Sequence, residues 1–212
     1  GNGSSWTRRN IGSATDGAQT VWAGDIDDDG DIDVAGGAAE EGGQLIWWEN
    51  TDGAATTWAA RPITTGLMIS IDGGDVDGDG DIDLLVSEAE SLSQPDNSIS
   101  WFVNVAGDGS SWNEHLIGVG PNGAGPSRDI QLADLDRDGD LDAAGAANGH
   151  WFQNVSGDAS TWSEHTGGPG GPFGFDAADA DGDDDLDLFS AKRGSNRVDR
   201  SENMKTDPHD DA

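Results

Sequence analysis

The chain has 212 residues and a formal net charge of −32, from 42 acidic and 10 basic residues. This charge argues against nucleic acid and anionic membrane surfaces as partners, because both select for Lys and Arg. There are no cysteines, so disulfides and thiolate metal sites are excluded. No hydrophobic run is long enough to cross a bilayer, so we expect no membrane insertion.

Short segments of strand character alternate along the chain with turns rich in Gly, Ser and Thr. The first repeat has expected strands at residues 19–25, 31–39 and 44–50. Strands that begin with Trp are expected at residues 6–11, 58–63, 112–117 and 162–165. No segment has a helical period, and four strands in roughly 50 residues is the content of one propeller blade.

The most informative stretch is residues 75–83, which read Asp-Val-Asp-Gly-Asp-Gly-Asp-Ile-Asp. Carboxylates at every second position repel one another and resist ionising together. A calcium ion relieves this repulsion, because it takes six to eight oxygen ligands that a tight loop can supply. Gly80 provides the left-handed turn that such a loop needs. We therefore predict a calcium loop here.

The same pattern recurs at residues 25–33, 134–142 and 179–187, so we predict a repeat protein with about four calcium ions, one per repeat. In the last copy Asp184 replaces the glycine, and Asp tolerates the left-handed conformation better than most residues. In each loop, positions 1, 3, 5 and 9 are expected to bind through carboxylates and position 7 through its main-chain carbonyl. The predicted metal-site residues are Asp25, Asp27, Asp29, Asp31, Asp33, Asp75, Asp77, Asp79, Asp81, Asp83, Asp134, Asp136, Asp138, Asp140, Asp142, Asp179, Asp181, Asp183, Asp185 and Asp187.

Position 12 separates this loop from other calcium motifs. An EF-hand or dockerin loop needs an acidic ligand there and flanking helices, whereas these loops carry Gly, Val or Ser at that position and have β-like flanks. Asp-x-Asp-x-Asp-Gly-x-x-Asp between two strands, repeated every 45 to 60 residues, resembles the FG-GAP/VCBS repeats of β-propellers. The resemblance covers nearly the whole chain. It implies propeller blades with calcium between the first two strands of each. Members include integrin α-chain heads, lectins and secreted bacterial adhesion or polysaccharide-active proteins, and the resemblance does not choose among them.

We expect an all-β fold, a small β-propeller of four four-stranded blades in a single domain at residues 1–204. The expected units are residues 13–63, 64–117, 118–165 and 166–204, followed by a loose tail at residues 205–212. The last unit lacks a Trp-led fourth strand, so we expect the N-terminal strand at residues 6–12 to pair with it and close the ring. The alternative is an open array that closes on another copy or on further sequence.

Aromatic residues form a second repeated pattern. Trp47, Trp101 and Trp151 each begin a pair of aromatic residues at equivalent places, with Asn three residues later. These rings are candidate ligand-binding residues that would stack on a sugar. The favoured interpretation is packing, because adjacent residues on a strand point to opposite faces and would contact both neighbouring blades.

Two smaller features complete the sequence. His115 and His165 share a Trp-x-Glu-His pattern that other repeats lack, so we interpret them as surface residues. Asn2 and Asn154 fit the N-glycosylation acceptor pattern.

Together these features predict a secreted, non-enzymatic, calcium-binding β-propeller that acts as an extracellular adhesion or assembly module. Millimolar calcium outside cells fills loops of modest affinity, which favours an extracellular or cell-surface location. Expected partners are extracellular proteins or glycans, and copies of the chain itself. Three alternatives stay open: a glycan-binding lectin, a subunit of an extracellular filament or surface layer, and an accessory domain of a polysaccharide-active enzyme.

Overall fold

The computed structural model describes residues 3–12, 17–40, 42–91, 94–119, 128–146, 149–166, 168, 174–192 and 196–203. These residues form β-strands and turns, and no helix occurs among them. The segment at residues 205–212, which the sequence predicts as a loose tail, lies outside the described residues. Within the described residues, no helix is long and apolar enough to cross a membrane.

The strands form four antiparallel sheets, each built from strands that follow one another in the chain. The first sheet contains β1 (Ala18–Gly24), β2 (Asp33–Ala38), β3 (Gln44–Asn50) and β4 (Trp58–Thr65). The second contains β5 (Leu67–Gly74), β6 (Asp83–Ser91), β7 (Gln94–Asn104) and β8 (Trp112–Val119). The third contains β9 (Gln131–Ala133), β10 (Asp142–Ala146), β11 (His150–Asn154) and β12 (Trp162–Thr166). The fourth contains only β13 (Gly174–Ala178), β14 (Asp187–Lys192) and β15 (Arg197–Ser201).

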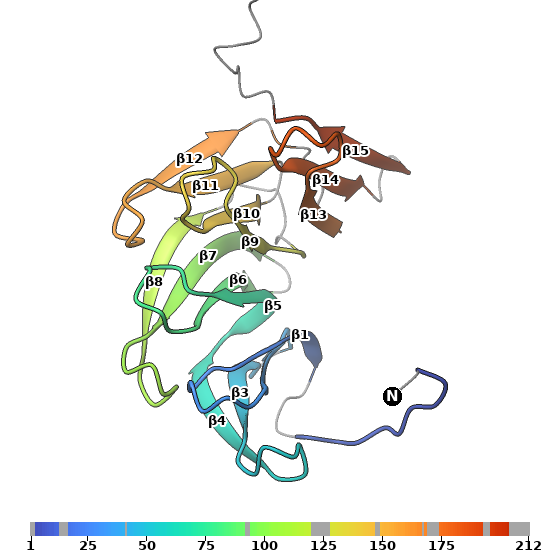
Figure 1. Cartoon of the computed structure of the whole chain (residues 1–212), viewed down its shortest axis with the longest axis vertical. Coiled ribbons are helices and arrows are strands. Elements are labelled where there is room, and N and C mark those ends of the chain that lie inside the picture. Colours follow the sequence, from blue (N-terminus) through green and yellow to red (C-terminus); the bar gives the residue numbers. More distant parts are fainter. Residues whose placement is uncertain are drawn as a thin grey trace, which may run out of the picture.

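The sheets follow one another around an arc, as propeller blades do (Figure 1). We call them blades A to D in chain order. The first strands of successive blades contact each other along the inside of the arc, β1 with β5, β5 with β9, and β9 with β13. The expectation of an all-β array of blades is therefore confirmed.

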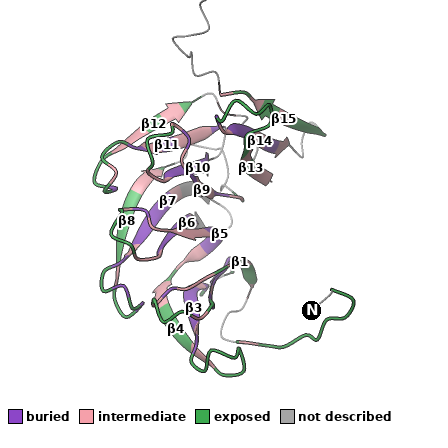
Figure 2. Ribbon diagram, in the orientation of Figure 1, coloured by how far each residue is buried: buried purple, intermediate pink, exposed green. Residues whose placement is uncertain are grey.

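Burial on both faces of the middle strands explains why successive apolar residues occur there. Leu84 and Leu85 in β6 point to opposite faces, and both are fully buried. Leu84 belongs to a cluster with Ile26 and Leu45 of blade A, whereas Leu85 packs with Ile130 and other residues of blade C. Figure 2 shows the buried residues concentrated on these middle strands. Blade B is thus held from both sides by apolar contacts.

Side chains of each first strand also bind the main chain of the next first strand. The Ile71 N–H donates to Thr20 Oγ1 at 3.1 Å and the Leu132 N–H to Asp72 Oδ2 at 2.7 Å. The same relation joins blades C and D, where the Ala177 N–H donates to Gln131 Oε1 at 2.9 Å. These bonds satisfy main-chain donors that face a neighbouring blade rather than a ladder partner.

The predicted closure of the ring by the N-terminal segment is not confirmed. Residues 5–12 form no strand, and the Trp6 side chain is 90% exposed. No sheet of the described residues contains a strand from this segment, and Figure 1 shows it extending away from the blades. Blades A and D lie at opposite ends of the arc, and the segment lies at the blade A end (Figure 1).

Substitution of Asp72 should weaken the contact between blades B and C. Asp72→Ala removes the acceptor of the Leu132 N–H, and we expect a loss of about 1–3 kcal/mol in the free energy of unfolding. Asp72→Asn keeps a side-chain oxygen and serves as the matched control. Urea unfolding measures the free energy of unfolding of both variants. Equal stabilities for the Ala variant and the wild type would contradict this role.

Candidate metal centres

The acidic loops connect the first and second strands of each blade, where the resemblance places calcium. In every loop, carboxylate oxygens of three aspartates lie within 4.8 Å of one another. In the first, second and fourth loops these are positions 1, 3 and 5, and in the third they are positions 1, 3 and 9. The groups are Asp25, Asp27 and Asp29; Asp75, Asp77 and Asp79; Asp134, Asp136 and Asp142; and Asp179, Asp181 and Asp183. The structure therefore brings together predicted side-chain ligands in all four repeats.

Each loop is shaped by its own main chain. The position-1 carboxylate accepts a hydrogen bond from the N–H of position 6, as Asp75 Oδ2 does from Gly80 at 3.1 Å. Position 6 is left-handed in all four loops, and Asp184 adopts this conformation in the fourth with φ of 69°. Position 4 is left-handed as well, with φ of 65° at Arg137. The sequence indicates the first of these positions through its glycine, whereas position 4 carries Asp, Gly or Arg and gives no consistent signal.

The position-9 aspartate has a structural role that the sequence did not indicate. Asp83 Oδ2 accepts from the Val76 N–H at 3.3 Å, within its own loop, and Asp83 Oδ1 accepts from the Asn104 N–H at 2.8 Å. The same pair of bonds occurs at Asp33, Asp142 and Asp187. Position 9 therefore fastens the loop to the end of the third strand, whether or not its remaining lone pairs face a cation.

The position-7 side chains lie against the turn between the third and fourth strands. The facing glycine has a φ of 60–71°, which favours glycine, and a Cβ atom on it would come within 2.5 Å of the carboxylate. These pairs are Asp31 with Gly53, Asp81 with Gly107 and Asp140 with Gly157. This placement agrees with a main-chain rather than a side-chain contribution to the metal.

The buried carboxylates of the loops resist ionisation. Burial raises the pKa of Asp83 and of Asp142 to about 6, and burial together with the charges of Asp33 and Asp29 raises the pKa of Asp27 to about 6. Asp27 Oδ1 is buried and has no hydrogen-bond partner among the described residues. A cation would supply both the missing partner and the missing positive charge. The donor set is oxygen only, which suits a hard ion such as calcium.

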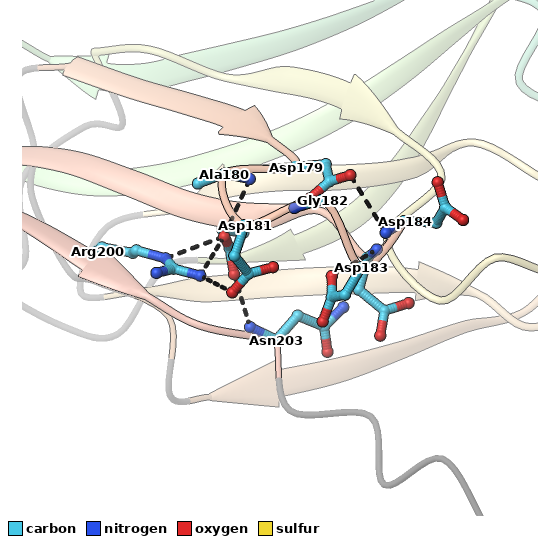
Figure 3. A network of polar contacts seen from close by, with 10 residues as sticks. Asp179, Ala180, Asp181, Gly182, Asp183, Asp184, Arg200 and Asn203 are labelled. Atoms are coloured by element: carbon cyan, nitrogen blue, oxygen red, sulfur yellow. Dashed lines mark hydrogen bonds and ion pairs between the residues drawn. The ribbon is translucent and has the colours of Figure 1, made fainter. Parts of the chain in front are cut away.

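The fourth loop differs because an arginine enters it (Figure 3). The Arg200 guanidinium donates to Asp187 Oδ2 at 2.9 Å and to Asp181 Oδ2 at 2.5 Å. These contacts lower the pKa of Asp181. Arg200 stands where Trp47, Trp101 and Trp151 stand in the other blades. The fourth loop therefore carries an internal cation, which already binds two of the predicted ligands.

The aromatic pairs pack between blades. Trp47 and Trp101 are 2% and 5% exposed, whereas Trp151 is only half-buried. His165 stacks on Trp151 with ring centroids 4.2 Å apart, and His115 lies tilted against Trp101 with centroids 5.1 Å apart. Burial of Trp47 and Trp101 favours the packing interpretation over a sugar-stacking surface.

The asparagine that follows the aromatic pair in blades B and C joins its blade to the loop of the preceding blade. Asn104 Nδ2 donates to the Ile26 carbonyl of the preceding loop at 2.8 Å, and Asn104 Oδ1 accepts from Gly109 N–H at 2.9 Å. Asn154 makes the corresponding bonds, to the Val76 carbonyl at 3.0 Å and from the Ala159 N–H at 3.0 Å. Asn154 is fully buried, which excludes it as a glycosylation site, and Asn2 lies outside the described residues. Recurrence of this Asn in the sequence was the signal that could have revealed the role.

The pKa shifts predict an unusual response of the metal-free protein to acid. Folded Asp27, Asp83 and Asp142 bind protons below about pH 6, whereas their ordinary pKa is 3.8. The folded state therefore binds more protons than the unfolded chain between these values, and in chelator the melting temperature should rise as the pH falls from about 7.5 to about 5. Calcium requires the ionised carboxylates, so the stabilisation by added calcium should shrink over the same range.

Differential scanning calorimetry with and without calcium measures both trends. Asp52→Asn is the control, because its exposed carboxyl has a pKa lowered to about 2 by a hydrogen bond from Thr56 and does not titrate in this window. A melting temperature in chelator that falls on acidification would contradict the assignment.

Comparison with known families supports the repeat. Residues 25–86 match the model of an FG-GAP-like repeat. The matched span runs from the first acidic loop through the second and into β6. A comparison with curated protein sequences gave no match. The FG-GAP/VCBS-type repeat that the sequence resembles is therefore confirmed in this chain over residues 25–86.

Proposed function

We propose that the protein is a calcium-stabilised, propeller-type module that acts outside the cell in adhesion or assembly, without catalytic activity. One observation carries the calcium part of this proposal: four loops of the same spacing each gather three carboxylates within 4.8 Å. FG-GAP repeats often bind calcium and are typically extracellular, which supports both the ion and the location. The charge of −32 suits neither nucleic acid nor anionic membrane as a partner.

Calcium would act mainly on stability. Without an ion, the loop carboxylates repel one another next to main-chain atoms that hold the blades together, such as the Ile26 carbonyl bound by Asn104. An ion that binds only the folded loop adds its binding free energy to folding. At a free calcium concentration 100 times the dissociation constant, one loop gains about 2.7 kcal/mol.

The architecture that fits this role is an array of blades completed by strand pairing. The N-terminal segment at residues 6–12 is the element that would complete blade D. In the same chain this pairing would give the closed four-blade ring that the sequence predicts, and between chains it would link copies.

Removal of calcium should lower the melting temperature by roughly 10–30 °C, because three or four loops each lose a few kcal/mol and a chain of this length shifts by 2–4 °C per kcal/mol. Calorimetry in millimolar calcium and in chelator measures the change. Magnesium serves as the control, since it demands a tighter octahedral site and should not restore the transition. An unchanged melting temperature in chelator would contradict the proposal.

The fourth loop should bind calcium most weakly. Arg200→Gln removes the internal cation, and we expect the affinity of this loop to rise about tenfold, because a unit charge beside a divalent ion costs on the order of 1 kcal/mol or more near a surface. Isothermal titration calorimetry resolves the weak site. The control is Arg197→Gln, which removes the pairing with Asp199 outside the loop. An equal affinity in wild type and Arg200→Gln would contradict the competition.

A glycan-binding role is the second candidate, favoured by a groove between blades B and C. Asp77 and Asp79 of the second calcium loop line it together with Trp101, Asn113 and Trp162. Carboxylates, an amide and aromatic rings in one groove suit a sugar. Calcium-dependent binding on a glycan array that is lost in Asn113→Ala would support this role. Absence of binding in millimolar calcium would exclude it for the glycans tested.

A further inference from the structure

In the described residues, blade D ends on β15. The outer edge of β15 has features that suit pairing with a further strand. In the other blades the third strand ends on an Asn paired with the Trp that begins the fourth strand. These pairs are Asn50 with Trp58, Asn104 with Trp112 and Asn154 with Trp162. Asn203 takes the same place after β15. Its N–H donates to Asp187 Oδ1 at 3.1 Å and its Nδ2 to the Leu135 carbonyl at 3.0 Å.

A cavity of about 240 Å³ lies beside Asn203, between blades C and D. Its lining includes Leu135, Trp151, Leu186, Leu188 and Ser201. The corresponding residues between blades A and B are Ile26, Trp47, Ile82, Leu84 and Phe102, and they form one cluster against which Trp112 packs. Between blades C and D, Ser201 replaces the phenylalanine, and no described residue takes the place of Trp112.

The exposure of Trp151 agrees with a missing neighbour. Trp47 is covered by the turn of the following blade, where a Cβ on Gly109 would lie 2.4 Å from its ring. Trp101 packs against Ala159 and Trp162 of the following blade. Both rings are buried, whereas Trp151, which has no such turn over it among the described residues, is half-buried. The cavity is therefore shaped for a Trp-led strand and its turn.

The N-terminal segment has the form of such a strand. Residues 3–6 read Gly-Ser-Ser-Trp, as residues 109–112 do, and Gly3 has φ of 70° where Gly109 has 65°. At the other end, a Cβ on Gly12 would lie 2.2 Å from the Trp48 ring of blade A. A Cβ on Gly118 of β8 would lie equally close to Phe152 of the next blade, at 2.3 Å. Gly12 thus lies against blade A at the place where the fourth strand of a preceding blade would.

We propose that residues 6–12 of one copy pair with β15 of a second copy, as the fourth strand of its blade D. In the register of the other blades, Trp6 lies opposite Asn203 and fills the cavity, and Thr7 lies opposite Glu202. Arg9 then takes the place of Arg61, which pairs with Glu49 at 2.6 Å, and Glu202 takes the place of Glu49. The inference rests on the proposed role in adhesion or assembly, and it names a second copy as the partner.

A second copy is a better partner for β15 than the same chain, because the N-terminal segment and blade D lie at opposite ends of the arc. The segment lies at the blade A end of the arc, where its Gly12 contacts Trp48, and blade D lies at the far end (Figure 1). Between copies, the blades need no rearrangement, and blade D of one copy comes to precede blade A of the next. The Asn50 side chain then faces the Ala180 carbonyl, as Asn104 faces that of Ile26 within a chain. Such a head-to-tail contact uses different surfaces on the two copies and generates chains or rings of copies.

The first test measures association by sedimentation velocity in millimolar calcium over a range of protein concentrations. We expect the mass to rise with concentration, and Trp6→Ala to raise the dissociation constant at least tenfold. Trp6 is exposed in the single copy, so its removal should leave the melting temperature of the dilute protein unchanged. A wild type that stays monomeric at the highest concentration, or association unaffected by Trp6→Ala, would overturn the proposal.

The second test identifies the paired strands, using a chain that has no cysteine of its own. Thr7→Cys and Glu202→Cys are made in separate chains, mixed and oxidised. We expect a disulfide-linked heterodimer, since opposite residues of paired strands lie within disulfide reach. Asn10→Cys with Glu202→Cys is the off-register control and should link poorly. Absence of the heterodimer from the mixture, or a disulfide formed within one chain when both cysteines are in it, overturns pairing between copies.

The melting temperatures of the same samples, with and without calcium, test the calcium proposal separately. A melting temperature that depends on calcium, without association or cross-linking, leaves the calcium module intact and removes only the pairing between copies.

Discussion

The structure depends on how each acidic loop is tied to the blades. The position-9 aspartate of a loop holds the loop with one carboxylate oxygen and the end of the third strand with the other. The asparagine at that strand end reaches the main chain of the preceding loop, as Asn104 reaches Ile26. Loop shape and blade stacking are therefore parts of one hydrogen-bond network, and a charge imbalance in a loop acts on the contact between two blades.

This coupling explains why the loops are so acidic and the apolar core so modest. The buried residues of the middle strands pack in single layers between blades, with Leu84 on one side and Leu85 on the other. The carboxylates with raised pKa values, Asp83 and Asp142, occupy position 9 of two predicted ion-binding loops. Ion binding would remove their repulsion and add free energy where apolar burial is limited. The acidic loop of blade D differs, because Arg200 supplies it with a positive charge from within the chain.

Periodic features of the sequence predicted most of the fold. Strand order, the four loops and the left-handed position 6 all follow from spacing and from glycine, and even Asp184 adopts the expected conformation. Packing of the aromatic pairs followed from the alternation of side chains along a strand. These properties are local, so a single sequence suffices to infer them.

Relations between blades could not be predicted in the same way. The sequence does not indicate which carbonyl Asn104 binds. Nor does it indicate that Asp72 accepts a hydrogen bond from Leu132 of the next blade. The repeat pattern does not indicate that Arg200 enters the fourth loop, and only the geometry shows its guanidinium bound to Asp181 there. The path of residues 6–12 depends on the angle between successive blades, which no residue pattern encodes directly.

Calcium neutralisation of the loops is the central claim, and NMR tests it residue by residue. The amides of Gly30, Gly80, Gly139 and Asp184 each donate to a position-1 carboxylate at a predicted ion site. During a calcium titration, all four amide signals should move to new positions, with that of Asp184 moving at the highest calcium concentration. Amide signals that stay in place up to millimolar calcium, in a protein that is folded throughout, would contradict the account.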